Sequence, residues 1–432
     1  MLARWLARWL ARWLYAAAAN LTTAAARWTP PGDSKTVIAM RARRGLQRRY
    51  DAWATEHRRH EPLLWMHAPS VGEGLQARPV LSLMRARHPG TQLAYTFFSP
   101  SAEEFSRALD VDFRDYLPFD SASATGAALD ALRPRALVFS KVDVWPEFVR
   151  QAKRRGVRLG MISATLPEGS SRRGGLAALV LRDAYAALDL VGAVDDADAA
   201  RLVELGVRPD AISVTGDTRY DQVWQRASSV NRQSPLLARF SGERLTIVAG
   251  STWPSDEAQL LPAFMALRKA HAGIRLIIAP HETGPEYVEP LAALAGRCQA
   301  KVARIDQPGS ESADVVIVDR FGVLGDLYAL ASVAFVGGGF HDAGLHSVLE
   351  PAAFGAPVVF GPRHERSRDA ALLIGAGGAR SCRDATEIEH TVGAWLANPA
   401  RRRDAGTRAH ALVESSRGAA ERSLQLIERL LA

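Results

Sequence analysis

The sequence predicts an α/β protein made of two doubly wound domains, each with a parallel sheet between layers of helices. The chain has 432 residues, which exceeds one ordinary hydrophobic core and fits two domains of about 200 residues each. Short apolar runs alternate with amphipathic stretches from residue 60 onward, as in parallel sheets with crossover helices. The alternation lapses once into a polar stretch and then starts again. We therefore expect a domain at 35–217, a linker at 218–240 and a domain at 241–432 with a helical tail.

The elements of the first domain follow from these runs. The expected strands are five short apolar segments: Leu63–His67, Gln92–Phe98, Ala136–Ser140, Arg158–Ser163 and Leu190–Val194. Amphipathic helices are expected between them at Gly74–His88, Ser101–Leu109 and Glu147–Arg155. The carboxyl ends of parallel strands lie at one edge of a sheet, where ligands of such folds bind.

The second domain repeats this order. Its expected strands are Arg244–Ala249, Ile274–Ala279, Val315–Val318, Val333–Val336 and Val358–Phe360. Its expected helices are Ser255–His271, Pro285–Ala295, Leu345–Phe354 and Ser367–Gly375, followed by the helical tail at 384–431. We expect the strand ends of the two domains to face each other across a cleft.

The composition is that of a folded protein from a reducing compartment. Hydrophobic residues make up 47% and charged residues 23% of the chain, which are ordinary values. The two cysteines, Cys298 and Cys382, form no Cys-x-x-Cys pair or metal-ligand cluster. This usage suits a cytoplasmic protein and argues against a disulfide scaffold or structural zinc.

The basic charge is concentrated at the N-terminus. Residues 1–60 hold 12 Lys/Arg and three Asp/Glu, an excess of +9, so the rest of the chain sums to −1 of the net charge of +8. A nucleic-acid-binding protein would carry its charge on the folded body, which here is close to neutral. A basic segment on a neutral body instead indicates an anionic membrane surface as the partner.

Residues 1–28 are predicted to form a membrane-associated helix. A Leu-Ala-Arg-Trp unit occurs three times, so two residue types recur every four positions and form stripes on a helix: Trp5, Trp9 and Trp13, and Arg4, Arg8 and Arg12. Tryptophan prefers the lipid headgroup boundary, and arginine pairs with anionic lipid there. The apolar stretch Trp13–Ala26 is shorter than the roughly 20 residues of a span, so we favour a helix that lies in the interface. A spanning helix and a signal peptide ending near Ala24–Ala26 are the alternatives.

The loop after the first strand carries a carboxylate suited to general-base chemistry. It reads His67-Ala-Pro-Ser-Val-Gly-Glu73-Gly74. Ser70 and Glu73 stand at the spacing of a helix capping box, which by itself explains both residues. Alternatively, Glu73 faces the cleft from the edge of the sheet and takes a proton from an attacking hydroxyl.

Two further strand ends carry polar side chains. Ser99 and Ser101 follow the second strand and either cap the next helix or contact substrate. Lys141, Asp143 and Trp145 follow the strand at 136–140, where plain packing would not favour such residues. An ion pair at the rim of the sheet is the alternative explanation for the two charges.

Strand ends of the second domain carry possible phosphate contacts. Ser251 lies in Ala249-Gly250-Ser251-Thr252, a turn whose N–H groups and hydroxyls suit a phosphate, although many strand-to-helix turns look alike. Pro280-His281-Glu282 follows the next strand, and His281 is as suited to a helix cap as to a ligand contact.

The most distinctive local pattern is a run of three glycines, 337–339, after the strand at 333–336. Glycines there would let a ligand approach the backbone closely. A helix start at Ser347 would present N–H groups to a phosphate, with Glu350 placed to accept bonds from sugar hydroxyls. Ser347 and Glu350 again have capping-box spacing, so a purely structural role is the alternative. The chain contains no P-loop motif and no Asp-rich or His-rich cluster, so no metal or cofactor is expected.

In their order and spacing, these motifs resemble those of the Kdo transferases. Members of that family are inverting glycosyltransferases of the GT-B fold, with two Rossmann-like domains. The resemblance runs from about Lys35 to about Ala379. It rests on motifs that are each moderately specific: Ser70-Val-Gly-Glu73, Val214-Thr-Gly-Asp-Thr-Arg219-Tyr-Asp221, the glycine run with Phe340, His346-Ser-Val-Leu-Glu350-Pro351, and Val359-Phe-Gly361-Pro362.

The resemblance implies a reaction, a location and a set of site residues. The donor would be CMP-Kdo, the acceptor a lipid A precursor such as lipid IVA, and the enzyme would be anchored N-terminally at the cytoplasmic face of the bacterial inner membrane. Glu73 would be the catalytic base, with Asp143 and Arg219 as further catalytic residues. Ser70, Gly72, Ser99, Ser101 and Lys141 would bind substrate. CMP would contact Ser251, Pro280, His281, Phe321, Gly322, Val323, Gly338, Gly339, His346, Ser347, Val348, Leu349 and Glu350.

Three positions depart from the family pattern. Lys141 replaces the first acid of a Glu-Thr-Glu-Leu-Trp-Pro motif, which puts a transition-state role copied to it in doubt, while Asp143 keeps the second acid. Arg219 stands in place of a lysine, which retains the charge and changes the geometry. Ser347 replaces the asparagine of a His-Asn pair.

Two other kinds of protein stay open. A GT-B transferase or an epimerase that uses a UDP-sugar would share the glycine-rich half but not the Ser-Val-Gly-Glu turn. A catalytically inactive sugar-binding protein at the membrane surface would keep the fold. Glu73 argues against that second alternative, and Lys141 keeps it open.

Overall fold

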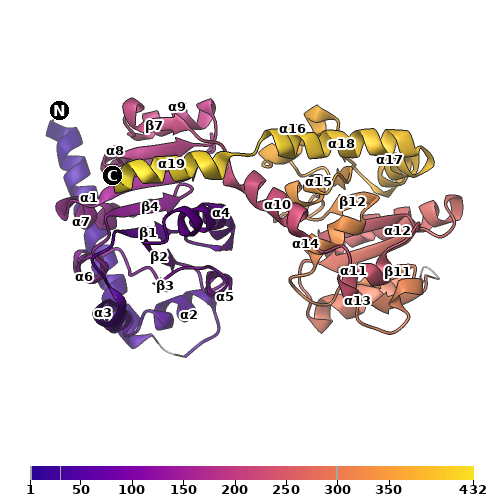
Figure 1. Ribbon diagram of the computed structural model, residues 1–432, viewed down its shortest axis with the longest axis horizontal. Coiled ribbons are helices and arrows are strands. Elements are labelled where there is room, and N and C mark those ends of the chain that lie inside the picture. The colour runs from indigo at the N-terminus through magenta and orange to yellow at the C-terminus, as the bar shows by residue number, and fades with distance from the viewer. Residues whose placement is uncertain (1, 30, 298–299) are drawn as a thin grey trace. The chain divides into compact units, whose positions relative to one another are not determined.

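The computed structural model describes residues 2–29, 31–297 and 300–432, and for residues 2–8, 27 and 176 it describes the backbone alone. Cys298 and the side chains of Arg4, Trp5 and Arg8 therefore lie outside the described set. The chain forms two compact units, one of Met1–Gln222 with Arg417–Ala432 and one of Val223–Ser416. Each unit contains a parallel sheet with helices on its faces (Figure 1), as the sequence predicts.

The first unit is built on a seven-stranded sheet in the order β3-β2-β1-β4-β5-β6-β7. The five predicted strands are β1 Leu63–His67, β2 Gln92–Phe97, β4 Ala136–Ser140, β5 Arg158–Ala164 and β6 Leu190–Ala193. In the centre, Met66 of β1 pairs in parallel with Tyr95 of β2 and Val138 of β4. The prediction missed the edge strands β3 Phe113–Tyr116 and β7 Ile212–Val214, because charged or exposed residues interrupt the apolar run that marks a buried parallel strand.

Helices cover both faces of this sheet. One layer contains α3 Leu46–His57, α6 Ala122–Leu132, α7 Pro146–Arg154 and α8 Gly175–Ala186, and the other contains α4 Val71–Arg87, α5 Ala102–Arg107 and α19 Ala419–Leu431. The unit also includes α2 Lys35–Ala42 and α9 Asp196–Leu205. The core between the layers is aromatic at its centre, where the Trp65 and Phe148 rings meet edge to face at 4.9 Å.

The last helix, α19, belongs to the first unit and lies beside α4 (Figure 1), which differs from the predicted domain at 241–432. Gly160 in β5 makes room for it, since a Cβ there would lie 2.5 Å from Leu430 Cδ1. The Asp221 carboxylate accepts hydrogen bonds from the N–H groups at the start of this segment, including that of Gly418 at 2.7 Å. Packing between distant segments leaves no local periodicity, so the sequence pattern could not assign the tail.

The second unit is built on a seven-stranded sheet in the order β10-β11-β9-β8-β12-β13-β14. The five predicted strands are β8 Thr246–Thr252, β9 Arg275–Pro280, β11 Val315–Ile317, β12 Val333–Val336 and β13 Val358–Phe360. The prediction again missed the two edges, β10 Val302–Arg304 and β14 Ala379–Ser381, which are short and only partly buried.

The predicted linker at 218–240 is helical, and the division between the units falls inside its first helix. It contains α10 Thr218–Ser229 and α11 Pro235–Phe240. The other helices of the second unit are α12 Pro254–Ala270, α13 Pro285–Arg297, α14 Leu324–Leu327, α15 Leu349–Ala353, α16 Arg368–Ala376, α17 Ala385–Ala397 and α18 Pro399–Ser415.

The N-terminal segment forms the predicted helix, α1 Leu2–Ala25, followed by a 3-10 turn at Ala26–Trp28. Its outer residues are exposed: Trp9 by 56%, Trp13 by 59% and Leu21 by 71%. Within the described part of the chain, no helix combines the length and the apolar character needed to cross a membrane.

Candidate active site

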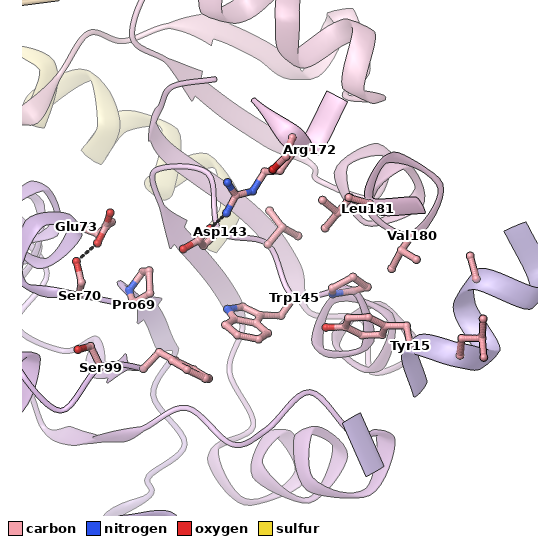
Figure 2. Close-up of a pocket in the computed structure, with 17 residues that line it drawn as sticks. Tyr15, Pro69, Ser70, Glu73, Ser99, Asp143, Trp145, Arg172, Val180 and Leu181 are labelled. Atoms are coloured by element: carbon pink, nitrogen blue, oxygen red, sulfur yellow. Dashed lines mark hydrogen bonds and ion pairs between the residues drawn. The ribbon is translucent and has the colours of Figure 1, made fainter. Parts of the chain in front are cut away.

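A cavity of about 960 Å³ lies at the carboxyl ends of β1, β2 and β4 in the first unit (Figure 2). Four of the predicted site residues line it: Ser70, Glu73, Ser99 and Asp143. The rest of its wall comes from the same loops, from the 3-10 helix Ser171–Arg173, from α1 and from α8: Pro69, Phe98, Val144, Trp145, Pro146, Ser171, Arg172, Ala11, Leu14, Tyr15, Ala177, Val180 and Leu181. The structure therefore brings three predicted loops together around one space.

Glu73 lies in the first turn of α4, and both of its carboxylate oxygens have partners. The Ser70 hydroxyl donates to Oε2 (Figure 2), and the Lys141 ammonium donates to Oε1 at 3.3 Å. Because Ser70 makes no side-chain bond to the helix backbone, the capping box does not form. Burial raises the pKa of Glu73, but the Ser70 hydrogen bond and the Lys141 charge outweigh it and leave the pKa below its ordinary value. Glu73 is therefore ionised at neutral pH.

Lys141 and Asp143 follow β4 and belong to two separate ion pairs. Lys141 has a backbone φ of 69°, a left-handed conformation that costs free energy in a residue other than glycine. Asp143 pairs with Arg172, and both line the cavity (Figure 2). Sequence reasoning missed Arg172, because the short 3-10 helix Ser171–Arg173 that carries it has no motif.

Trp145 and Phe98 form an aromatic wall of the cavity, with their rings stacked at 5.0 Å. Trp145 Nε1 donates to His67 Nε2 at 3.3 Å. Burial lowers the pKa of His67 to about 3, so the imidazole is neutral and can accept at Nε2. Its Nδ1 lies 3.1 Å from the Thr96 carbonyl oxygen, which fits a proton on Nδ1. This chain of contacts fixes the orientation of the tryptophan.

The remaining substrate-binding candidates of the first unit differ in position. The Ser99 and Ser101 hydroxyls lie 2.8 Å apart, and only Ser99 lines the cavity. Ser101 precedes α5 without a side-chain cap, so the capping alternative does not explain it. Gly72 is exposed, and a Cβ there would meet only the Ser70 hydroxyl, at 3.8 Å. Packing therefore does not require glycine at that position.

Arg219 lies at the start of α10 and is not among the residues that line the cavity. Its Nε donates to the buried Asp217 carboxylate at 2.8 Å, and Gln76 of α4 donates to the same carboxylate at 3.2 Å. Burial raises the pKa of Asp217, but Arg219 outweighs this effect and the pKa lies below its ordinary value. The pair connects α10 to α4 one turn beyond Glu73.

Helix α1 forms one wall of the cavity, which sequence reasoning did not anticipate. The Tyr15 hydroxyl donates to Asp120 Oδ2 at 2.7 Å. Asp120 also accepts from the backbone N–H groups of Glu147 and Phe148 at the start of α7, and burial raises its pKa to about 6. Asp120 was missed because it follows β3, a strand that the apolar pattern did not reveal.

In the second unit, packing of the protein itself requires the glycines after β12. A Cβ on Gly338 would lie 2.1 Å from the Gly344 carbonyl oxygen, and one on Gly339 would lie 2.4 Å from the Gly361 nitrogen. A Cβ on Gly337 would clash with backbone in the same way. The glycines let neighbouring strand ends approach each other, so the predicted approach of a ligand is not needed to explain them.

Asp256 organises this glycine loop from the first turn of α12. Its buried carboxylate accepts from the backbone N–H groups of Trp253 at 2.9 Å, Gly338 at 2.8 Å and Phe340 at 3.0 Å. Burial raises the pKa of Asp256, and these bonds offset the effect only in part. Sequence reasoning did not single out Asp256, because an acid in the first turn is an ordinary helix-start residue.

Trp253 and three histidines form an aromatic cluster that includes two of the predicted contacts. The Trp253 ring stacks on His281 at 4.5 Å and on His341 at 4.1 Å, and its Nε1 donates to His346 Nε2 at 3.3 Å. Burial, together with the charges of the two other histidines, lowers the pKa of His346 to about 4. Among the described residues, no group of three or more His, Cys, Asp or Glu is placed to hold a metal ion.

The segment from His346 to Glu350 differs from the predicted helix start. Helix α15 begins only at Leu349, and its N-cap residue Val348 has no side-chain cap, so the capping box of Ser347 and Glu350 is wrong. The Val348 and Leu349 side chains belong to the core, whereas Ser347 is exposed. Burial raises the pKa of Glu350, although the charge of Arg226 opposes this.

The other predicted donor contacts lie at or near strand ends of the second sheet. Ser251 has a φ of 55° at an irregularity of β8, and Pro280 is the last residue of β9. Phe321 is 70% exposed, Gly322 has a φ of 88°, and Val323 precedes α14. The second unit thus has an exposed aromatic ring and exposed backbone near the edge of the sheet at which Trp253 and the three histidines lie.

Comparisons with known proteins agree with the resemblance. Residues 40–222 match the family model described as 3-deoxy-D-manno-octulosonic-acid transferase (kdotransferase). The 3-deoxy-D-manno-octulosonic acid transferase of Bordetella pertussis is 32% identical over 379 residues, which cover 84% of this chain and 86% of that protein. The Haemophilus influenzae protein of the same name is 25% identical, over 92% of this chain and 93% of its own.

Solved structures support the fold. A UDP-GlcNAc 2-epimerase from Neisseria meningitidis aligns with 85% of this chain and 100% of its own, with a TM-score of 0.63 and 13% sequence identity. A likeness at that identity speaks for the fold alone, which is GT-B-like with two parallel seven-stranded sheets. Since the identity to the Bordetella protein extends over most of both chains, this glycosyltransferase belongs to the family of 3-deoxy-D-manno-octulosonic acid (Kdo) transferases.

Proposed function

We propose that the enzyme transfers Kdo from CMP-Kdo to a lipid A precursor such as lipid IVA in lipopolysaccharide biosynthesis. One observation carries the proposal beyond family membership. Glu73 borders a cavity at the strand ends with both carboxylate oxygens oriented and its pKa held low. An ionised carboxylate in such a place can accept the proton of a hydroxyl group within hydrogen-bond reach.

In the proposed reaction, the acceptor hydroxyl gives its proton to Glu73 while its oxygen bonds to the anomeric carbon of Kdo. The bond between that carbon and the phosphate oxygen breaks, and CMP leaves with the electron pair. Attack from the face opposite CMP inverts the configuration of the carbon. Ser70 and Lys141 orient the base. They also lower its proton affinity, so the enzyme keeps the base ionised at the expense of basicity.

The polar end of the cavity supplies positive charge for the acidic groups of a sugar lipid. Lys141 does not line the cavity itself, but it contacts Glu73, which does, and its side chain is 43% exposed, so its remaining N–H groups can reach a ligand. Arg172 lines the cavity and is oriented by Asp143. We therefore assign Asp143 to positioning Arg172, and not to proton transfer.

We assign donor binding to the second unit. The cluster of Trp253, His281, His341 and His346 and the glycine loop fixed by Asp256 lie at strand ends, where nucleotides bind in doubly wound folds. Backbone N–H groups and cationic side chains would stabilise the charge on the leaving phosphate. The proposal includes no metal and no other cofactor.

We further propose that α1 holds the enzyme on the cytoplasmic face of the bacterial inner membrane. Exposed tryptophan and leucine side chains on α1, together with the arginines that recur along its sequence, support an interfacial position. Binding to vesicles that contain anionic lipid should weaken as salt is added, because the charge attraction is screened. Equal binding to neutral and anionic vesicles would contradict the electrostatic part of this proposal.

Nucleotide-dependent unfolding tests the donor assignment against a UDP-sugar enzyme. A nucleotide present at about 100 times its Kd stabilises the folded state by about 2.7 kcal/mol. We expect CMP to raise the thermal midpoint and UDP to leave it unchanged. A rise with UDP alone would contradict the assignment. Incubation with CMP-Kdo and lipid IVA, followed by mass measurement of the lipid, tests the transfer itself.

A further inference from the structure

The cavity around Glu73 has two chemically different ends. Figure 2 shows Ser70 and Glu73 at one end and Tyr15 and Val180 toward the other. The lining of that second end, which includes Leu14 of α1, is mostly hydrocarbon. A site for a sugar alone would not need such an end, since burial of apolar surface is favourable only for a ligand that also has an apolar part.

Specific contacts fix α1 in place as a wall of this space. The Tyr15 hydroxyl bonds Asp120, which is buried and caps the start of α7. Three residues before Tyr15, Arg12 forms an ion pair with Asp183 of α8. The helix is therefore seated on the first unit through side chains next to the cavity, in addition to any attachment to a membrane.

A second cavity, of about 540 Å³, continues the apolar floor on the other side of Tyr15. It lies between α1, α7 and α8 and shares Tyr15, Pro146 and Val180 with the first cavity. Its rim carries four basic side chains and two acidic ones: Arg12, Arg150, Lys153, Arg154, Glu147 and Asp183. Arg12 pairs with Asp183, Arg150 with Glu147, and Lys153 with Asp189. The apolar side chains that this second cavity shares with the first are suited to the hydrocarbon part of an amphiphile.

We infer that α1 and α8 form a binding site, called the seat below, for a hydrocarbon chain of the acceptor. The N-terminal helix would then recognise the substrate as well as a membrane. The inference rests on the proposed function, in which the acceptor is a sugar lipid. With a sugar hydroxyl at Glu73, a chain attached to that sugar extends toward Leu14 and Val180 along one continuous cavity. The apolar end thus lies where the acceptor's chain would have to go.

Two leucines on one helix provide a matched comparison. Leu14 is 49% exposed and lines the cavity, whereas Leu10, one turn earlier, is 51% exposed and does not. Leu14→Gln, Val180→Gln and the control Leu10→Gln are assayed with an acylated acceptor and with the same sugar stripped of its chains, in one detergent. We expect Leu14→Gln and Val180→Gln to raise KM for the acylated acceptor roughly tenfold, the effect of losing burial of about two methylene groups. For the stripped acceptor, these two variants should keep the wild-type KM. The Leu10→Gln variant should keep the wild-type KM for both acceptors.

The outcomes separate this inference from the proposed function. Equal changes of KM on the two acceptors, or equal effects of Leu10→Gln and Leu14→Gln, would overturn the seat and leave Kdo transfer intact. A wild-type enzyme with the same KM for both acceptors would do so as well. Failure of the wild-type enzyme to transfer Kdo to either acceptor would instead contradict the proposed function.

A second measurement requires no turnover and no variant. An acylated acceptor with a photoreactive diazirine on its chain is bound to the wild-type protein, illuminated, and the labelled peptides are identified by mass. We expect labels at 11–15 of α1 and at 177–181 of α8, which line the cavity. Labels only around the exposed Trp9 and Leu10, with none on α8, would show that the chain stays outside and would overturn the inference.

Discussion

Replacing Lys141 with asparagine tests how its charge controls the pKa of Glu73, the proposed base. Lys141→Asn removes the charge, and asparagine tolerates the left-handed φ of 69° at this position. The Lys141 Nζ lies 3.3 Å from Glu73 Oε1, and the lysine side chain is 43% exposed. Two unit charges at that separation attract by about 1.3 kcal/mol in bulk water and by about 5 kcal/mol at a dielectric constant of about 20. Because solvent screens the half-exposed lysine, we expect the low end of this range, about 1–2 kcal/mol.

The direction of the effect on activity follows from the sign of this interaction. Lys141 lowers the pKa of Glu73, so its removal raises that pKa, and the base then becomes protonated at a higher pH. The acid limb of the profile of kcat/KM against pH should move upward by roughly one pH unit. Lys141→Arg retains the charge and should leave the limb near its wild-type position. Coincident acid limbs for Lys141→Asn and wild type would refute the coupling between Lys141 and the base.

Three further changes test other parts of the structure. Gly339→Ala places a Cβ 2.4 Å from the Gly361 nitrogen and should lower the free energy of unfolding by about 1–3 kcal/mol in a urea titration. The control Gly375→Ala, with open space around its Cβ in α16, should not destabilise the protein. Asp256→Ala leaves three backbone N–H groups of the glycine loop and helix start without their acceptor. CMP binding measured by calorimetry should therefore weaken about tenfold or more. An unchanged affinity for CMP would exclude a role of the glycine loop in donor binding. Tyr15→Phe removes a hydrogen bond to the buried Asp120 carboxylate, which is worth roughly 1.5–3 kcal/mol. Limited proteolysis should therefore cut α1 faster than in wild type. Equal rates of cleavage would show that Tyr15 does not attach α1 to the first unit.

The central strands of both sheets could be predicted from the sequence, and their edges could not. A strand buried on both faces, such as β1 Leu63–His67, reads as an unbroken apolar run. The edge strand β3 contains Arg114 and Asp115, of which Asp115 pairs with Arg49. Local pattern alone cannot distinguish such an edge from a loop, because its partners come from distant parts of the chain.

Spacing rules failed where tertiary contacts compete for the same side chain. Ser70 and Glu73 have capping-box spacing, yet the serine hydroxyl bonds the carboxylate, which Lys141 also contacts from another loop. Ser347 has the same spacing to Glu350, but it lies outside a helix that begins only at Leu349. In both places the strand-end segment was located correctly, and only the alternative explanation by a capping box is wrong.

The residues that line the cavity fall into two groups, those that could be identified from the sequence and those that could not. Ser70, Glu73, Ser99 and Asp143 could be found because each follows a strand, and parallel strands bring their carboxyl ends together. Arg172 and the α1 residues come from segments that carry no strand-end signal. Only the folded chain brings them to the site, so neither periodicity nor motif could assign them.

Replacing the Glu73 carboxylate with its amide tests the central claim most directly. Glu73→Gln keeps the size of the side chain and an oxygen for the Ser70 hydroxyl, but it cannot take a proton. The measurement is the rate of Kdo transfer from CMP-Kdo to detergent-dispersed lipid IVA, with stabilisation by CMP as the check on folding. We predict a fall of roughly 10²–10⁴-fold in kcat with stabilisation by CMP unchanged. A folded Glu73→Gln enzyme that retains kcat within about tenfold of wild type would contradict the assignment of Glu73 as the base.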